Sequence, residues 1–158
     1  TKESIFNLII HSKFSKIELE RSNVLDLFAG SGSFGLECLS RKSNFVTFVE
    51  NYRSVIKILK NNIKTFKIDK NYEIIEDDIF NNKFFQNINK KFDLIFLDPP
   101  FDLIDYKMLI RAIFQNNVLN EDGKIFLESS KHTSIELSKT QNVLKDKNIG
   151  DVRLIILQ

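Results

Sequence analysis

The segment at residues 93–101 carries the residue types best suited to chemistry on a nitrogen atom. It is an apolar run that ends in Asp98, Pro99, Pro100 and Phe101, and it contains both prolines of the chain. Proline has no backbone N–H, so Pro99 offers only a carbonyl oxygen in a restrained, extended segment. The Asp98 carboxylate and the Pro99 carbonyl could each accept one hydrogen bond from an exocyclic amine, while Phe101 could stack on its ring. We predict that this catalytic tetrapeptide aims the amine lone pair at a methyl carbon; the alternative is a rigid turn over a buried Phe.

A second group of residues has the spacing of a turn that binds a cofactor. The apolar run at residues 23–28 leads into a G-x-G-x-x-G sequence formed by Gly30, Gly32 and Gly35. Glycine permits positive φ and lets backbone N–H groups approach a ligand closely. Glu50 follows at about the expected distance of ~20 residues, where a carboxylate can accept hydrogen bonds from two ribose hydroxyls. The pattern predicts a site for a cofactor that contains adenosine.

Further carboxylates narrow the choice of cofactor. Asp26 lies inside the first apolar run, where a buried carboxylate needs a polar partner. The ammonium group of S-adenosylmethionine could supply that partner and NAD could not, although a structural partner is also possible. After a third apolar run, Asp77 or Asp78 could accept the adenine amino hydrogens and Ile79 could cover the ring; the alternative is a solvated loop or a helix N-cap. The other cofactor-binding residues that we predict are Phe28, Ala29, Ser31 and Asn51.

Short apolar segments that alternate with amphipathic ones predict a parallel sheet wound with helices. Strands are expected at residues 23–28, 45–50, 72–76, 92–98 and 124–128, and helices at residues 2–10, 34–41, 53–66 and 106–115. Residues 142–145 and 152–157, around a turn at residues 148–150, could form a terminal hairpin with an antiparallel strand. The predicted site residues then gather at the carboxyl edge of the sheet.

The composition fits one globular domain over residues 1–158. Hydrophobic residues make up 42% of the chain and charged residues 28%, and no apolar stretch approaches the ~20 residues of a membrane span. No secretory leader is recognisable, so we expect a cytoplasmic protein. We also expect the protein to be a monomer. The lone Cys38 lies in an apolar helical pattern and is expected to be a core thiol. His11 and His132 lack the spacing of metal ligands, and no metal is expected.

The two motifs together resemble those of amino-methyltransferases that act on nucleobases. The phrase at residues 27–32, the opening at residues 2–7 and the late segment at residues 126–128 are similar to the bacterial 16S ribosomal RNA guanine-N2 methyltransferase family. This resemblance covers essentially the whole chain. It implies a mostly parallel, seven-stranded Rossmann-like sheet with helices on both faces and an antiparallel C-terminal strand.

The same resemblance implies S-adenosylmethionine as the cofactor and methyl transfer to a guanine N2 of 16S rRNA, either free or in an assembling small ribosomal subunit. The family has a basic, glycine-containing segment before the opening helix, and this sequence does not include it. We therefore expect this chain alone to hold RNA weakly.

Other functions explain parts of the pattern. Related tetrapeptides serve adenine N6 in DNA and glutamine in proteins, although a DNA enzyme usually needs an added recognition region. An NAD-dependent oxidoreductase would explain Gly30 to Glu50 but would leave Asp98 to Phe101 unused. A non-catalytic RNA-binding module would leave the acids and glycines of both motifs without a role.

Overall fold

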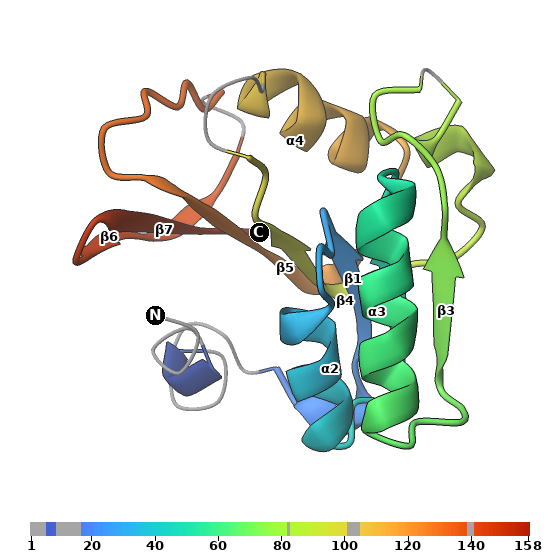
Figure 1. Ribbon diagram of the computed structural model, residues 1–158. Coiled ribbons are helices and arrows are strands. Elements are labelled where there is room, and N and C mark those ends of the chain that lie inside the picture. The colour runs from blue at the N-terminus through green and yellow to red at the C-terminus, as the bar shows by residue number, and fades with distance from the viewer. Residues whose placement is uncertain (1–5, 9–16, 82, 101–104, 139–140) are drawn as a thin grey trace.

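Seven strands form one sheet in the order β3-β2-β1-β4-β5-β7-β6 (Figure 1). The computed structural model describes residues 6–8, 17–81, 83–100, 105–138 and 141–158. The strands are β1 (Asn23–Leu27), β2 (Phe45–Val49), β3 (Tyr72–Ile75), β4 (Phe92–Leu97), β5 (Leu119–Ser130), β6 (Val143–Ile149) and β7 (Val152–Leu157). Strands β1 to β5 pair in parallel, whereas β7 is antiparallel to both β5 and β6. The predicted mostly parallel sheet with an antiparallel C-terminal strand is confirmed.

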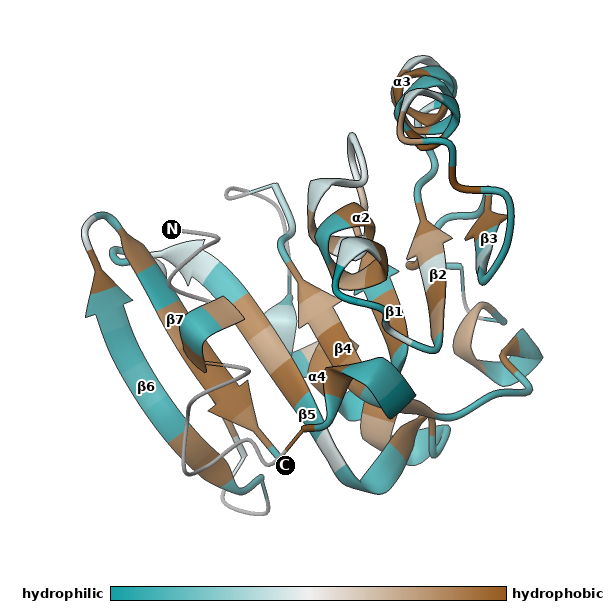
Figure 2. Ribbon diagram, turned by 90° about the horizontal axis from the view of Figure 1, so that it is seen from below, coloured by the Kyte–Doolittle hydropathy of each residue, from teal (hydrophilic) through white to brown (hydrophobic). Residues whose placement is uncertain are grey.

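Helices cover both faces of this sheet, as expected for an α/β protein. The helical elements are α2 (Ser33–Ser40), α3 (Arg53–Thr65), α4 (Tyr106–Gln115) and the short 3-10 helices η1 (Leu19–Arg21) and η2 (Phe85–Asn87). Figure 2 shows α2 and α3 on one side of the sheet and α4 on the other. Two separate hydrophobic clusters reflect this layering, one under α2 and α3 and one under α4. No helix in the described segments is both long and apolar enough to cross a bilayer.

The central strands are buried on both faces because helices pack against each side. Nearly every residue of β1, β2 and β4 is buried, which explains why these strands read as continuous apolar runs rather than alternating ones. The predicted bounds of these strands and of α2, α3 and α4 agree with the structure within about a residue. Of the predicted opening helix, only residues 6–8 are described, and they are helical.

Strand β5 is longer than the sequence predicts. Its expected start was Lys124, but the strand begins at Leu119, which pairs with Phe92. The register then shifts, and Leu94 pairs with Lys124. The polar residues between these two pairs leave the ladder and form a bulge. Their polar composition is typical of a turn, which is why the sequence analysis placed the start of the strand after them.

The C-terminal hairpin is also longer than predicted. Strand β6 runs on to Ile149, which pairs with Val152, so the turn is formed by Gly150 and Asp151 and not by residues 148–150. Gly150 has a positive φ of 63°, which a tight hairpin turn needs. Figure 2 shows that β7 is mainly hydrophobic and β6 mainly hydrophilic, as expected for an inner strand beside an edge strand.

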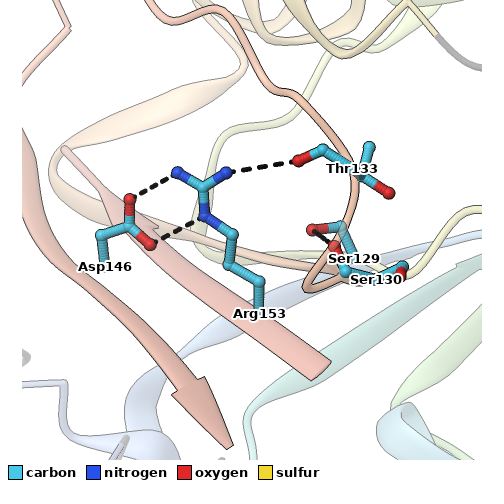
Figure 3. A network of polar contacts seen from close by, with 5 residues as sticks. All are labelled: Ser129, Ser130, Thr133, Asp146 and Arg153. Atoms are coloured by element: carbon cyan, nitrogen blue, oxygen red, sulfur yellow. Dashed lines mark hydrogen bonds and ion pairs between the residues drawn. The ribbon is translucent and has the colours of Figure 1, made fainter. Parts of the chain in front are cut away.

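Arg153 ties this hairpin to the preceding loop (Figure 3). Its Nη2 and Nε donate to the two carboxylate oxygens of Asp146, at 2.7 and 2.9 Å. Its Nη1 donates to the Thr133 carbonyl at 3.3 Å. The bidentate pair fixes the guanidinium, which then restrains the connection between β5 and β6.

Candidate active site

A cavity of about 700 Å³ opens at the carboxyl edge of the sheet, beyond the ends of β1, β2 and β4. Its volume is in the range of sites for small molecules and cofactors. The cavity is lined by Phe28, Ala29, Gly30, Ser31, Ser33, Val49, Glu50, Asn51, Tyr52, Val55, Asp77, Asp78, Ile79, Phe80, Asp98, Pro99 and Pro100. Residues from the glycine turn, the acidic cluster and the tetrapeptide therefore meet in one place.

The glycine turn after β1 follows a path that few residues can adopt. Gly30 and Gly32 have positive φ angles of 57° and 82°, in the left-handed region that glycine enters without strain. Gly35 serves a different purpose, because a Cβ placed there would lie 2.3 Å from Cε1 of Phe48. Gly35 thus lets α2 pack closely on β2, as predicted for the last glycine of the motif. Gly32 and Gly35 do not line the cavity.

Glu50 joins two of the loops that border the cavity. It is only 9% exposed, and its Oε2 accepts a hydrogen bond from the Gly30 N–H at 3.0 Å. Its Oε1 accepts from the N–H groups of Asn51 and Tyr52, at 2.9 and 3.0 Å. A carboxylate has about four acceptor positions. Backbone N–H groups use three of those of Glu50, which leaves about one. The sequence predicts the place of this carboxylate but not its role in holding the loops together.

Asp26 is buried, as predicted, but does not line the cavity. Its Oδ2 accepts a hydrogen bond from the Gly35 N–H at 3.0 Å, in the first turn of α2. A carboxylate is favourable there because the first N–H groups of a helix lack partners within the helix. The sequence analysis gave a structural partner for Asp26 as the alternative to a cofactor, and the Gly35 N–H is such a partner. A contact between Asp26 and a cofactor stays a prediction.

The acidic loop after β3 presents two carboxylates and two apolar side chains to the cavity. Asp78 is exposed, and its Oδ1 accepts from the Phe80 N–H at 2.9 Å. Asp77 is half-buried, and its Oδ1 accepts from the Asp78 N–H at 2.7 Å. Ile79 is buried at the wall. In both Asp77 and Asp78, the hydrogen bond just described is accepted by Oδ1 and not by Oδ2.

Phe80 is a lining residue that the sequence analysis missed. It is 40% exposed, and its ring centroid lies 6.2 Å from that of Phe28, the residue that follows β1 at the start of the glycine turn. The signal that could have found it is its place directly after Asp77, Asp78 and Ile79. An exposed aromatic ring at this edge offers a flat apolar surface to a planar ligand.

The first three residues of the tetrapeptide form another wall of the cavity. Strand β4 ends at Leu97, and Asp98, Pro99 and Pro100 follow it into the lining. Asp98 is half-buried and Pro99 is buried. Phe101 lies outside the described residues, so its stacking role stays a prediction.

Tyr106, the first residue of α4, is a second residue that the sequence analysis missed. Its side chain is buried, and its hydroxyl has no hydrogen-bond partner within the described part of the chain. Burial and the nearby negative charge of Asp98 both raise the pKa of this hydroxyl. In the sequence, Tyr106 looks like an ordinary core residue of an amphipathic helix.

The remaining candidates lie away from the cavity. Cys38 is fully buried in α2, and burial together with the charges of Asp26 and Glu37 raises the pKa of its thiol well above the ordinary value. It is a core thiol, as predicted. His132 is exposed and does not line the cavity, whereas His11 lies outside the described residues. Among the described residues, no three or more His, Cys, Asp or Glu side chains cluster in a way that could hold a metal ion.

Comparison with known proteins gives consistent matches over the whole chain. A sequence model of the family described as "Conserved hypothetical protein 95" matches residues 1–158. A Haemophilus influenzae protein named "Ribosomal RNA small subunit methyltransferase D" is 32% identical over 158 residues, which are 99% of this chain and 79% of the relative. A Buchnera aphidicola protein of the same name is 33% identical over 152 residues, 96% of this chain and 75% of the relative.

Solved structures share the fold. A methylase from Haemophilus influenzae superposes with a TM-score of 0.81 at 33% identity, covering 99% of this chain and 94% of the other. A methyltransferase solved in complex with S-adenosylhomocysteine gives a TM-score of 0.75 over 96% of this chain and 48% of its own. Its identity is only 15%, so this second likeness concerns the fold alone.

Proposed function

Because this chain belongs to the family described as "Conserved hypothetical protein 95", we propose that it transfers a methyl group from S-adenosylmethionine to N2 of a guanine in 16S ribosomal RNA. The predicted reaction class, S-adenosylmethionine-dependent methylation of ribosomal RNA, is supported by the relatives named "Ribosomal RNA small subunit methyltransferase D". The guanine N2 position is the finer part of the proposal.

The charge of the cavity is the observation that best supports this cofactor. The lining includes the four carboxylates of Glu50, Asp77, Asp78 and Asp98, and no Lys, Arg or His among the described residues. S-adenosylmethionine carries a sulfonium cation, an ammonium cation and one carboxylate, so its net charge is positive and such a lining attracts it. NAD carries a pyrophosphate with negative charge, which the same lining repels. The site therefore favours S-adenosylmethionine over the cofactor of the alternative oxidoreductase.

The lining residues suggest how the cofactor is held. Glu50 lies where one ribose hydroxyl could donate to its remaining acceptor position. Ile79 and Phe80 offer apolar surface to the adenine ring. Asp77 and Asp78 each keep an oxygen that could accept the adenine amino hydrogens. When bound, the cofactor supplies a methyl group activated by its positively charged sulfur.

The acceptor side of the reaction is assigned to Asp98 and Pro99. The two N–H groups of an exocyclic amine donate to the Asp98 carboxylate and the Pro99 carbonyl, which directs the nitrogen lone pair at the methyl carbon. The carbon–nitrogen bond forms as the carbon–sulfur bond breaks, and the nitrogen releases one proton to Asp98 or to solvent. Positioning supplies most of the acceleration in such a transfer.

The test measures transfer of labelled methyl from S-adenosylmethionine to small ribosomal subunits and to free 16S rRNA, both from cells that lack this protein. Mass mapping of the labelled nucleotide tests for guanine N2, and label on adenine N6 or on a protein would contradict it. The Asp98→Ala variant should lose roughly 100-fold or more in rate, the scale of losing a group that acts in the transition state. Its affinity for the cofactor should change far less, because Glu50, Asp77 and Asp78 keep the lining negatively charged. Asp69→Ala is the matched control, because Asp69 is exposed at the opposite edge of the sheet. Near wild-type transfer by Asp98→Ala would place the acceptor site elsewhere.

A further inference from the structure

The side-chain hydroxyl of Tyr106 is buried and has no hydrogen-bond partner in the part of the chain that the structure describes. The residue as a whole is 5% exposed. Buried polar atoms without a partner are rare in native proteins, and each one needs an explanation. Ser43 is the other such residue in the described segments, and it lies before β2, at the edge of the sheet away from the cavity.

The position of Tyr106 relates it to the acceptor site. Its ring packs in the hydrophobic cluster that includes Leu97, the last residue of β4, and Leu109 of α4. Asp98 follows Leu97 directly and is close enough for its charge to raise the pKa of the Tyr106 hydroxyl. Tyr106 does not line the cavity, whereas Asp98 does. Any effect of this hydroxyl on a bound acceptor should therefore pass through Asp98.

The chemistry of the two groups is complementary. An ionised carboxylate only accepts hydrogen bonds, and it has about four acceptor positions on two oxygens. The other titratable groups that line the cavity with Asp98 are the side chains of Glu50, Tyr52, Asp77 and Asp78. The raised pKa of Tyr106 means that its hydroxyl stays protonated at neutral pH and remains a donor.

We propose that Tyr106 is a positioning residue, whose hydroxyl donates a hydrogen bond to Asp98 when the acceptor base is bound. One carboxylate oxygen of Asp98 then faces Tyr106 and the other faces the amine of the base. The hydroxyl thereby selects the orientation of Asp98 that methyl transfer needs. This inference rests on the proposed function, because it assigns Tyr106 to the same acceptor site.

The Tyr106→Phe variant removes the hydroxyl and keeps the ring. Hydrogen bonds to charged groups are the stronger ones in proteins, so the single-turnover rate of methyl transfer should fall about 10-fold or more. The dissociation constant for S-adenosylmethionine should stay unchanged, because Tyr106 does not line its cavity. The melting temperature should stay equal or rise, because the hydroxyl makes no hydrogen bond with any described residue. Tyr72→Phe is the matched control, since Tyr72 lies in β3 and outside the cavity lining.

A double-mutant cycle separates this role from others. In the Asp98→Ala background, Tyr106→Phe should cause no further loss of rate, because its partner is gone. Equal losses in both backgrounds would mean that Tyr106 acts independently of Asp98, and would overturn the inference. Wild-type rates for Tyr106→Phe, or a lower melting temperature with weaker cofactor binding, would overturn it as well. A wild-type chain that methylates no ribosomal RNA would instead refute the proposed function on which the inference rests.

Discussion

Replacing Glu50 with Gln should loosen the two loops that border the cofactor cavity. Gln has the same shape as Glu, but one of its two terminal atoms is a donor. If its oxygen remains near Asn51 and Tyr52, its amide NH₂ faces the Gly30 N–H, and that hydrogen bond is lost. The opposite orientation loses two hydrogen bonds instead of one. The variant should therefore lose at least the contact with Gly30.

The size of the effect follows from this count. Losing one buried hydrogen bond to a charged group costs about 1.5–3 kcal/mol. For a chain of this length, each kcal/mol lowers the melting temperature by about 2–4 °C, so the variant should melt about 3–12 °C lower. If the same free energy is needed to order the Gly30 loop when the cofactor binds, cofactor affinity falls about 10-fold to 150-fold.

Thermal unfolding followed by circular dichroism, and calorimetric titration with S-adenosylhomocysteine, measure the two effects on Glu50→Gln. Glu76→Gln is the control: Glu76 is exposed near the same edge, pairs with Lys60 on the surface, and does not line the cavity. It should change the melting temperature by no more than about 2 °C. If Glu50→Gln matched this control, the carboxylate would not hold the loops. A lower melting temperature with unchanged affinity would show that the conformation of the Gly30 loop does not affect cofactor binding.

Three further substitutions test the core and the pH dependence of stability. Gly35→Ala should lower the free energy of unfolding by about 1–3 kcal/mol, because its Cβ would lie 2.3 Å from Phe48; an unchanged urea midpoint would contradict the packing. Burial raises the pKa of Cys38 above the ordinary 9.0, so the thiol of the folded chain keeps its proton at a pH where that of the unfolded chain loses it. Stability therefore falls as pH rises above 9. The Cys38→Ala variant should show a smaller fall between pH 8 and 10 in urea titrations. The hydrogen bond from Arg153 lowers the pKa of Asp146 below the ordinary 3.8, so its contribution is present above that pH and is lost as pH falls through the lowered value. Asp146→Asn should cost no more than about 1 kcal/mol at pH 6 and less at pH 2; an equal cost at both would contradict the linkage.

The central strands could be predicted closely because their signal is local. Strands β1, β2 and β4 are continuous apolar runs between polar residues, and proline ends β4. Strand β5 could not be bounded in the same way. Its bulge holds polar residues that belong to the strand only through the pairing of Leu119 with Phe92, which no local pattern reveals.

The candidate site could be predicted in outline for a related reason. Parallel strands end at one edge of a sheet, so residues that follow β1, β2, β3 and β4 must come together there. The sequence could not show which partner each side chain takes. The hydrogen bond from Gly35 to Asp26, and the burial of the Tyr106 hydroxyl within reach of the charge of Asp98, depend on how segments pack in three dimensions.

The position of β7 also bears on how the chain reaches its native state during synthesis. Strand β7 lies between β5 and β6, although it follows both in the sequence. In the described segments, β6 pairs with β7 alone, so β6 cannot join the sheet before residues 152–157 have left the ribosome. Until then the outer edge of β5 stays open, and its unpaired backbone groups could pair with another nascent chain. Crowded polysomes should therefore be the setting in which this protein most needs a chaperone.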